Sequence, residues 1–395
     1  GEGCSDYLVY PDGSGYFPDI QTAVDAAVDG GDVVLADGVF AGPRNRDVLV
    51  QGKSVNFRSL SEDEGSCIID CSDEERAPHR AITFRGADWP TCRVEDLTIR
   101  GGSRPDGRGG ALLATDGSLV YVRECVLTLN EAARGAAVAA DSLAELDISS
   151  CELSRNTAAE GGAVWGRNSE LAVIGSTIAE NAADVGSGIA VIGGSLGAMQ
   201  SIVAFGGGGA AVECDGVAPE FDCTDVYGNQ GGDWVGCLAG QLGVDGNACE
   251  NPLFCDPAAG DYTLVESSPC LDLSECLFAL APQMGRYGVG CAQAGTPENG
   301  PDAGRLSLSQ NHPNPFNPAT TLAYAVPAEG HVRLTIHDLA GRVVRVLLDE
   351  RRPAGPSTVR WDGRNARGRA VAAGIYFARI EHDGRSDVRK LVGGK

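Results

Sequence analysis

The chain has 395 residues, with 55 glycines, 14 cysteines and a formal net charge of −23. This length accommodates two or three domains. Residues 1–303 carry 46 acidic and 16 basic side chains, whereas residues 304–395 carry 8 acidic and 15 basic ones. An acidic body repels nucleic acid and anionic membrane surfaces, so we expect neither as a partner. No run of 18 apolar residues is present, so we also expect no membrane span.

The N-terminal region predicts one helix followed by irregular strands. From Asp19 to Val28 the apolar residues follow helical spacing, and Gly30-Gly31 ends the pattern. We expect this helix to cap the exposed end of the β structure that follows. Short apolar alternations then predict early strands near residues 32–35, 48–50, 55–57, 67–69 and 81–84.

The stretch from Cys92 to Val212 repeats itself. Asn130, Asn156 and Asn181 recur 26 and 25 residues apart, and small-residue segments recur with them at 109–112, 135–138, 161–164 and 186–189. The units run 93–118, 119–144, 145–169, 170–194 and from 195 onward. Their apolar residues alternate with period 2, which indicates strands. A fixed period of this length predicts a solenoid in which each unit is one coil of three short strands, a parallel β-helix.

Equivalent residues of successive coils should stack about 4.8 Å apart, so like side chains form columns. We predict one inward column made of Cys92, Val122, Ile148 and Val173. The recurring asparagines should form a side-chain ladder at a turn, where asparagine tolerates the left-handed conformation. The small-residue segments are expected where two backbones pass too closely for a larger side chain.

These repeats resemble the right-handed parallel β-helix family known from pectate lyases and many bacterial surface proteins. The resemblance covers roughly residues 5–291, with regular coils over about 92–212 and cysteine-rich closing coils over 213–291. The Gly-Gly-Ala-Val and Leu-x-x-Asn segments also look like the repeats of polymorphic outer-membrane proteins. The resemblance implies a right-handed solenoid and is unspecific for activity.

All 14 cysteines lie between Cys4 and Cys291, and eight of them fall in residues 213–291. An even count without a Cys-x-x-Cys motif predicts disulfides and an oxidising compartment rather than zinc. Cross-links would support closing coils that lack a neighbour on one side. Cys125 and Cys151 occupy equivalent positions in adjacent coils, so they form either a disulfide or a pair of stacked core thiols. With no starting Met and no cleavable apolar segment, the chain is expected to be a mature product.

Residues 292–304 have the composition of a linker, and residues 305–395 form a separate domain. About seven strands separated by turns predict a small immunoglobulin-like sandwich. Its alternating runs are 322–326, 332–337, 343–348, 357–361, 375–380 and 386–392.

Four motifs in this domain begin at Asn311, Trp361, Ala373 and Arg389. They resemble the type A C-terminal sorting domain of the type IX secretion system, and they also look like the immunoglobulin-like domain of flagellar hook-capping proteins. The motif residues are Asn314, Pro315, Phe316, Trp361, Asp362, Gly363, Gly374, Tyr376 and Lys390. The resemblance implies the type IX export machinery as a partner of residues 305–395. It also implies a location outside the cell or on the outer surface of a Gram-negative-type bacterium. The alternative is an accessory sandwich with no sorting role.

The body shows no recognisable catalytic motif. Lyases on this fold need a base, often Lys or Arg, and hydrolases need paired carboxylates. Only one lysine, Lys53, and one histidine, His79, precede the linker, and the motif sets of polygalacturonases, pectin methylesterases and classical pectate lyases are lacking. Acidic clusters such as Glu62–Glu64 offer oxygen ligands for Ca²⁺, but no calcium-loop pattern is present. We therefore expect a solvated acidic surface and no cofactor.

The sequence thus predicts an exported or surface-displayed β-helix protein without catalysis, whose long face binds a ligand, a polysaccharide or another copy of itself. One alternative is a polysaccharide lyase or glycoside hydrolase acting on acidic glycans. An arginine base is one possibility for it, and the candidates in the regular coils are Arg93, Arg100, Arg104, Arg108, Arg123, Arg134, Arg155 and Arg167. The other alternative is a self-assembling extracellular filament subunit. A groove in which Arg and acidic side chains converge would favour the enzyme, and a flat Ser/Thr/Asn face would favour the binder.

Overall fold

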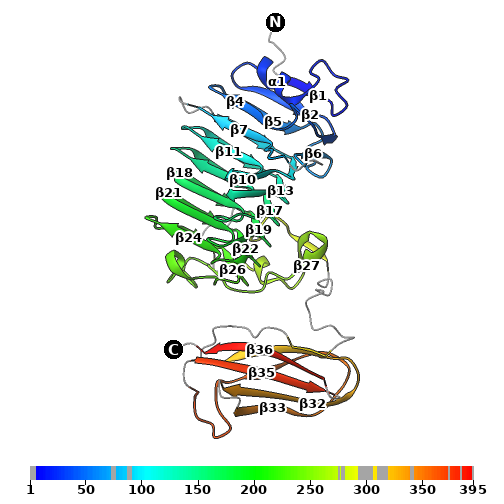
Figure 1. Ribbon diagram of the computed structural model, residues 1–395, viewed down its shortest axis with the longest axis vertical. Helices are drawn as coiled ribbons and strands as arrows, with labels where there is room; N and C mark the ends of the chain where they lie inside the picture. Colours follow the sequence, from blue (N-terminus) through cyan, green and yellow to red (C-terminus); the bar gives the residue numbers. More distant parts are fainter. Residues whose placement is uncertain are drawn as a thin grey trace. The chain divides into compact units, whose positions relative to one another are not determined.

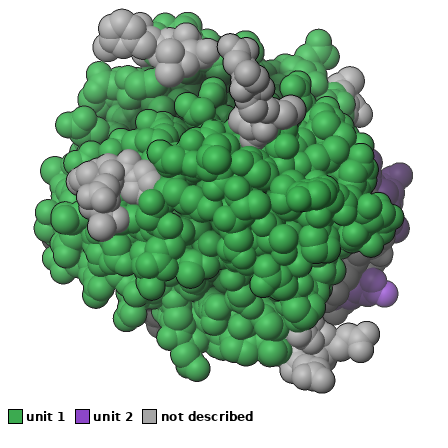
Figure 2. Space-filling view, turned by 90° about the horizontal axis from the view of Figure 1, so that it is seen from above, with its two compact units in different colours: residues 1–255, 262–293 green, residues 256–261, 294–395 purple. Residues whose placement is uncertain are grey.

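The computed structural model describes residues 6–72, 77–86, 91–274, 276, 281–291, 306–308, 319–338, 342–371, 374–382 and 385–393. The chain divides into two compact units, one formed by residues 1–255 with 262–293 and the other by residues 294–395 with 256–261 (Figure 2). The first is a parallel β-solenoid and the second is a small immunoglobulin-like sandwich (Figure 1). The all-β fold class predicted from the sequence is confirmed.

Helix α1 (Ile20–Ala26) lies at the N-terminal end of the solenoid (Figure 1). Its N-cap is Asp19, whose carboxylate accepts a hydrogen bond of 2.7 Å from the backbone N–H of Thr22. Three of its side chains, Ile20, Ala23 and Val24, are buried in the same core as the first strands. The helix is therefore the predicted cap, although it ends at Ala26 and leaves Val28 60% exposed.

Each regular coil has three strand segments, here called legs, and each leg pairs in parallel with the same leg of the next coil. Leg 1 consists of β4 (Val48–Gln51), β7 (Ile82–Arg85), β11 (Leu112–Thr115), β15 (Val138–Asp141), the first halves of β18 (Val164–Ile174) and β21 (Ile189–Met199), and β24 (Val212–Asp215). Leg 2 consists of β1 (Asp6–Val9), β2 (Gly31–Leu35), β5 (Val55–Ser59), β8 (Thr91–Glu95), β12 (Leu119–Arg123), β16 (Glu145–Ser149), the second halves of β18 and β21, and β25 (Glu220–Asp222).

Leg 3 consists of β3 (Gly38–Phe40), β6 (Cys67–Asp70), β9 (Thr98–Arg100), β13 (Val126–Thr128), β17 (Glu152–Ser154), β19 (Thr177–Ala179), β22 (Ile202–Ala204) and β26 (Asp225–Tyr227). Two further short parallel pairs lie between leg 3 and leg 1 in the chain: β10 (Ser103–Arg108) with β14 (Glu131–Arg134), and β20 (Ala182–Ala183) with β23 (Gly207–Gly208).

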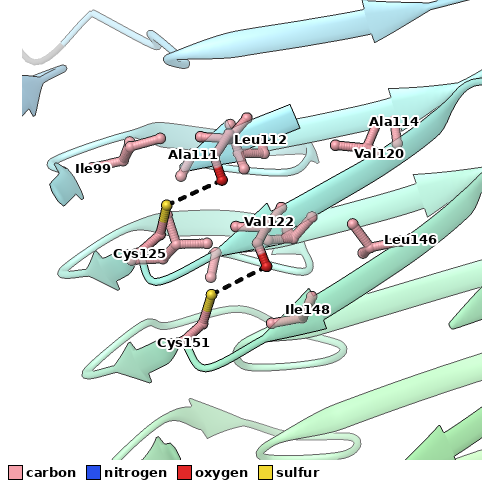
Figure 3. Close-up of a cluster of buried hydrophobic side chains, with 14 of the residues drawn as sticks. Ile99, Ala111, Leu112, Ala114, Val120, Val122, Cys125, Leu146, Ile148 and Cys151 are labelled. Atoms are coloured by element: carbon pink, nitrogen blue, oxygen red, sulfur yellow. Dashed lines mark hydrogen bonds between the residues drawn. The ribbon is translucent and has the colours of Figure 1, made fainter. Parts of the chain in front are cut away.

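The inward side chains of the legs form one continuous apolar core (Figure 3). Val122, Ile148 and Val173 stack in register, as predicted. Val94, and not Cys92, continues that column, because Cys92 pairs with Val120. Cys92 and Val94 both point inward on β8, so the alternation alone allows either residue, and the prediction was wrong in choosing Cys92. β10 is two residues longer than its partner, since Arg104 pairs with Ala132 but Arg108 pairs with Arg134. The first regular coil is therefore longer than its neighbours.

The asparagine ladder is present in the structure. The side-chain N–H of Asn130 donates to Oδ1 of Asn156, and that of Asn156 donates to Oδ1 of Asn181, each at 3.0 Å. All three side chains are buried. The left-handed residue is the one before each asparagine, since Leu129, Arg155 and Glu180 have φ of 56°, 54° and 55°. The expectation that asparagine itself takes this conformation was wrong: its amide is used for the ladder.

The small-residue segments lie at close backbone approaches, as predicted. A Cβ added at the first glycine of each segment would lie 2.1–2.3 Å from a carbonyl oxygen, and each of these glycines has positive φ: Gly109, Gly135, Gly161 and Gly186. No larger residue fits there without moving the backbone.

Cys125 and Cys151 are separate, buried thiols, the second of the two alternatives (Figure 3). Cys125 donates to the Val94 carbonyl at 3.4 Å, and Cys151 donates to the Val122 carbonyl at 3.3 Å. Burial raises the pKa of the Cys125 thiol well above its usual value. In the closing coils three disulfides form, Cys214–Cys237, Cys223–Cys276 and Cys255–Cys291, while Cys249 and Cys270 are free.

The described residues between 249 and 291, here called the closing segment, fold back along the outer face of leg 3. The closing segment contains β27 (Phe254–Asp256), η2 (Pro257–Ala259), β28 (Asp261–Val265), η3 (Pro269–Leu271) and β29 (Val289–Cys291). Its apolar side chains Phe254, Tyr262, Leu264 and Met284 share a buried cluster with Ile202 of leg 3. The preceding η1 (Gly236–Leu238) contacts β24 of leg 1, and its Leu238 joins the solenoid core.

The second unit has a three-stranded and a four-stranded antiparallel sheet. The first contains β30 (Ser307–Leu308), β31 (Thr320–Val326) and β34 (Gly355–Trp361), and the second runs β33 (Val343–Arg352), β32 (Gly330–Asp338), β35 (Gly374–His382) and β36 (Arg385–Gly393). One core cluster takes side chains from both sheets, including Tyr324, Ile336 and Trp361. Each predicted alternating run falls inside one of these strands or coincides with its end.

Candidate functional site: the open face of leg 2

The outer face of leg 3 is closed by the closing segment. The Tyr262 hydroxyl donates to Glu180 and the Tyr287 hydroxyl donates to Glu152, each at 2.8 Å. Arg286 donates to the Cys125 carbonyl at 2.6 Å and forms an ion pair with Glu64. Glu152 is consequently only 6% exposed, and burial raises the pKa of its carboxyl group. From β17 to β26 this face therefore offers no surface to a ligand, whereas nearer the N-terminus Val39 is 46% exposed and the Arg100 side chain is 42% exposed.

The outer face of leg 1 is partly covered. Its outward residues Leu113, Ala139, Trp165 and Ala190 form a small buried cluster. Arg134 of β14 lies over the Trp165 ring, with the guanidinium carbon 5.6 Å from the ring centroid. The short β10–β14 sheet thus shields the middle of leg 1.

The outer face of leg 2 is open, and its outward side chains form two parallel rows. One row is Arg93, Tyr121, Asp147, Ala172, Gly197 and Glu220. The neighbouring row is Glu95, Arg123, Ser149, Ile174, Met199 and Asp222. Most of these side chains are half-buried, and Arg93, Arg123 and Glu220 are exposed.

A first hollow of about 400 Å³ lies over the N-terminal part of these rows. It is lined by Thr91, Arg93, Tyr121, Arg123, Asp147, Ser149 and Ile174. Partial burial raises the pKa of the Asp147 carboxyl group, and this outweighs the lowering effects of the Ser149 hydrogen bond and the Arg123 charge. The hollow therefore combines one aromatic ring, two guanidinium groups and one carboxyl group that resists ionisation.

A second hollow of about 580 Å³ continues from Ile174 toward the closing coils. It exists because Ala172 and Gly197 are the smallest members of their row, and Met199, Gln241 and Val244 are among the residues around it. Asp222 and Asp245 lie together there, and burial and the Asp245 charge raise the pKa of Asp222. Because both hollows share Ile174, we describe them together as the leg-2 groove.

The first hollow of the leg-2 groove suits carbohydrate binding better than glycoside hydrolysis. Aromatic rings contact the apolar faces of sugar rings, and guanidinium groups hydrogen-bond to hydroxyl and carboxylate oxygens. A glycoside hydrolase needs two carboxyl groups about 5–9.5 Å apart. Asp147 and Asp222 are separated by three strand steps, or about 14 Å. They are too distant to form such a pair.

The acidic clusters singled out for Ca²⁺ are largely engaged within the chain. Asp63 accepts hydrogen bonds from Gly65 and Ser66, and Asp70 pairs with Arg100 at 2.9 Å. Over the residues that the structure describes, no group of three His, Cys, Asp or Glu side chains is arranged to hold a metal ion. The expectation of no cofactor, with Ca²⁺ as the one possibility considered, stays a prediction.

Of the residues named from the sequence, only Arg93 and Arg123, two of the eight candidate arginine bases, lie in the leg-2 groove. The asparagine ladder and the two thiols are internal. Trp361 is buried, donates from its indole N–H to the Arg364 carbonyl at 2.9 Å, and meets Tyr376 edge-on with ring centroids 5.6 Å apart. Asp362 accepts from the Arg364 backbone N–H, and Gly363 has a φ of 67°.

These motif residues of the second unit therefore explain how a turn and a core form. Gly374 begins β35 and Lys390 lies in β36. Asn314, Pro315 and Phe316 lie outside the described residues. Arg93 and Arg123 were only two of many arginines in the regular coils, and Tyr121 and Asp147 were missed altogether. Their outward position in the period-2 alternation was the available signal.

Comparison with known proteins supports the second unit only. Residues 319–385 match the family model of the FlgD Ig-like domain. The hook-capping side of the sequence resemblance is thus supported over this segment. No curated protein matches the chain. Within the part of the chain that the structure describes, no helix is long and apolar enough to cross a membrane.

Proposed function

We propose that this protein is displayed outside the cell and binds polysaccharide in the leg-2 groove without turning it over. This proposal rests on a difference between two faces of the same coils. The closing segment covers leg 3, whereas leg 2 has a hollow beside Tyr121, Arg93 and Arg123. The three disulfides support folding in an oxidising compartment. The groove is not a flat Ser/Thr/Asn face, so the enzyme alternative needs its own test.

Binding is tested with the full chain by affinity electrophoresis in gels that each contain one polysaccharide, while released reducing ends report turnover. Tyr121→Ala should weaken retention at least tenfold, the usual effect of removing a central aromatic contact. Tyr16→Ala is the matched control, because Tyr16 is 91% exposed and remote from the groove. Equal retention of the two variants would show that the leg-2 groove is not the binding surface.

A specific observation favours a second candidate function, a glycoside hydrolase. Asp222 and Asp245 are neighbouring carboxyl groups, and Asp222 Oδ1 is buried without a hydrogen-bond partner among the described residues. Two neighbouring carboxyl groups, one of which has a raised pKa, are the arrangement of a general acid and its partner. Turnover that disappears in both Asp222→Asn and Asp245→Asn would replace the binding proposal with this one.

We further propose that residues 305–395 are an export address recognised by a type IX machine. The motif resemblance supports this, and so does the change of charge at the linker. Deleting 305–395 should leave a folded, disulfide-bonded solenoid that stays in the cell envelope of a host that has this machinery. Fractionation of that host is the test. A truncated chain that reaches the surface as efficiently as the full chain would make the second unit an accessory sandwich.

The filament alternative is less favoured. Helix α1 covers the N-terminal end of the coils, and its buried residues Ile20, Ala23 and Val24 occupy the position that a stacking neighbour would need.

A further inference from the structure

The described residues contain a second group of exposed cations, away from the leg-2 groove. Arg108 of β10, Arg134 of β14 and Arg167 of β18 gather beside Trp165 on leg 1, with side chains 35%, 45% and 48% exposed. The guanidinium carbons of Arg134 and Arg167 lie 5.6 and 5.7 Å from the Trp165 ring centroid. Such stacking fixes the plane of each guanidinium and leaves its N–H edge available.

The carboxylates present do not neutralise this group. Asp141 is almost fully buried and pairs with both Arg108 and Arg167, the latter through two hydrogen bonds of 2.9 and 2.8 Å. Glu160 takes two hydrogen bonds from Arg134, of 3.0 and 3.3 Å. Counting Arg85, which pairs with Asp116 beside Arg108, four cations thus face three carboxylates. Burial, followed by the positive charges of Arg167 and Arg134, lowers the pKa of Arg108, and the charge of Asp116 opposes this.

Hydrogen-bond donors are also in excess here. A guanidinium carries five N–H donors, and Arg134 and Arg167 each commit two of them to a carboxylate. The Trp165 indole N–H is buried, and the described residues supply no acceptor for it. Trp165 packs closely against Gly135, where an added Cβ would lie only 2.9 Å from the Trp165 Cβ and backbone N. Surplus positive charge and unused donors around a closely packed ring are the features of an anion site.

We infer that Arg108, Arg134 and Arg167 form a binding site over Trp165 for an oxyanion, the chemistry shared by the sulfate and carboxylate groups of acidic polysaccharides. The site lies on leg 1, so it does not depend on the proposed function of the leg-2 groove. It would add an anchoring point for charged polymers on a body whose net charge otherwise repels them.

The first test uses the full chain and inorganic sulfate alone. Sulfate should change the fluorescence of Trp165, isolated as the difference between the wild-type protein and Trp165→Phe. In Arg134→Ala the concentration for half-change should rise about tenfold, as expected for the loss of hydrogen bonds to a charged group. Arg100→Ala is the matched control: Arg100 is 42% exposed, lies on leg 3 and pairs with Asp70. It should shift the midpoint less than twofold.

A second variant changes binding in the opposite direction. Glu160→Gln releases Arg134 from its carboxylate and should tighten sulfate binding several-fold, whereas Asp70→Asn on leg 3, which changes net charge equally, should not. Dextran sulfate and polygalacturonate then distinguish sulfate from carboxylate as the natural group, with neutral dextran as the blank. No sulfate-dependent Trp165 signal, or equal effects in the paired variants, would overturn the site and leave only non-specific attraction.

Discussion

Legs 2 and 3 are built from the same coils and bury the same kinds of inward side chain, yet their outer faces differ. On leg 3, Glu152 is covered by Tyr287 and hydrogen-bonded to Ser154 and Tyr287. On leg 2, Asp147 of the same coil faces a hollow. Burial raises the pKa of both carboxyl groups, but only Asp147 lies where a ligand has access. The inward residues of a solenoid define its fold, and the coverage of its outer faces defines where it acts.

The largest expected change in the free energy of unfolding distinguishes inward from outward residues on leg 2. Ile148→Asp places an unpaired carboxylate in the core column and should destabilise the solenoid by about 4 kcal/mol or more. The adjacent outward change Asp147→Asn should alter the free energy of unfolding by about 0.5 kcal/mol at most. Chemical denaturation of both variants checks this. An Ile148→Asp protein as stable as the parent would reverse the assignment of faces.

A smaller effect, a pH dependence of the free energy of unfolding, is expected from Asp225. This outward residue of leg 3 is fully buried beneath the closing segment. Burial is the main cause that raises its pKa from 3.8 to about 7, and the charges of Asp233 and Glu250 add to this. The Glu250 backbone N–H and the Cys270 thiol donate to it and lower the pKa, but less strongly.

Because the folded pKa is the higher one, this stabilisation is complete below about pH 4 and is lost as the pH rises through 7. The free energy of unfolding should fall by a few kcal/mol across that window, at about 1.4 kcal/mol per pKa unit. Asp225→Asn should flatten the profile, measured by denaturation at several pH values. An equally steep fall in this variant would show that another group is responsible.

A modest loss of stability is expected from removing a hydrogen bond between the closing segment and leg 3. Tyr287→Phe leaves the buried Glu152 with one partner fewer and should cost about 1–3 kcal/mol. Tyr121→Phe, on the open face, should cost almost nothing. In hydrogen exchange, Tyr287→Phe should lose amide protection first in strands β17 and β19 and in residues 281–291. Equal stability of the two variants would mean that the closing segment does not hold leg 3 closed.

The periodic parts of the structure could be predicted from the sequence, because each coil repeats the same local pattern. The column through Val122 and Ile148, the asparagine ladder and the sandwich strands all follow from such patterns. The register error at Cys92 arose because Cys92 and Val94 both face inward, so the alternation does not decide which of them pairs with Val122. The coverage of leg 3 was unpredictable, since Arg286 contacts Glu64 across 222 positions of sequence. The second hollow of the groove depends on Ala172 and Gly197 lying side by side, which only the register reveals.

The two methionines of the chain report directly on the contrast between open and closed faces. Met199 lines the leg-2 groove, whereas Met284 is 3% exposed beneath the closing segment on leg 3. Dilute peroxide, followed by peptide mass spectrometry, measures the oxidation rate of each thioether. Our account predicts that Met199 is oxidised at least tenfold faster than Met284, and that a retained polysaccharide slows Met199 alone. Equal rates, or a bound polysaccharide that leaves Met199 unprotected, would contradict the claim that the open face of leg 2 is the binding surface.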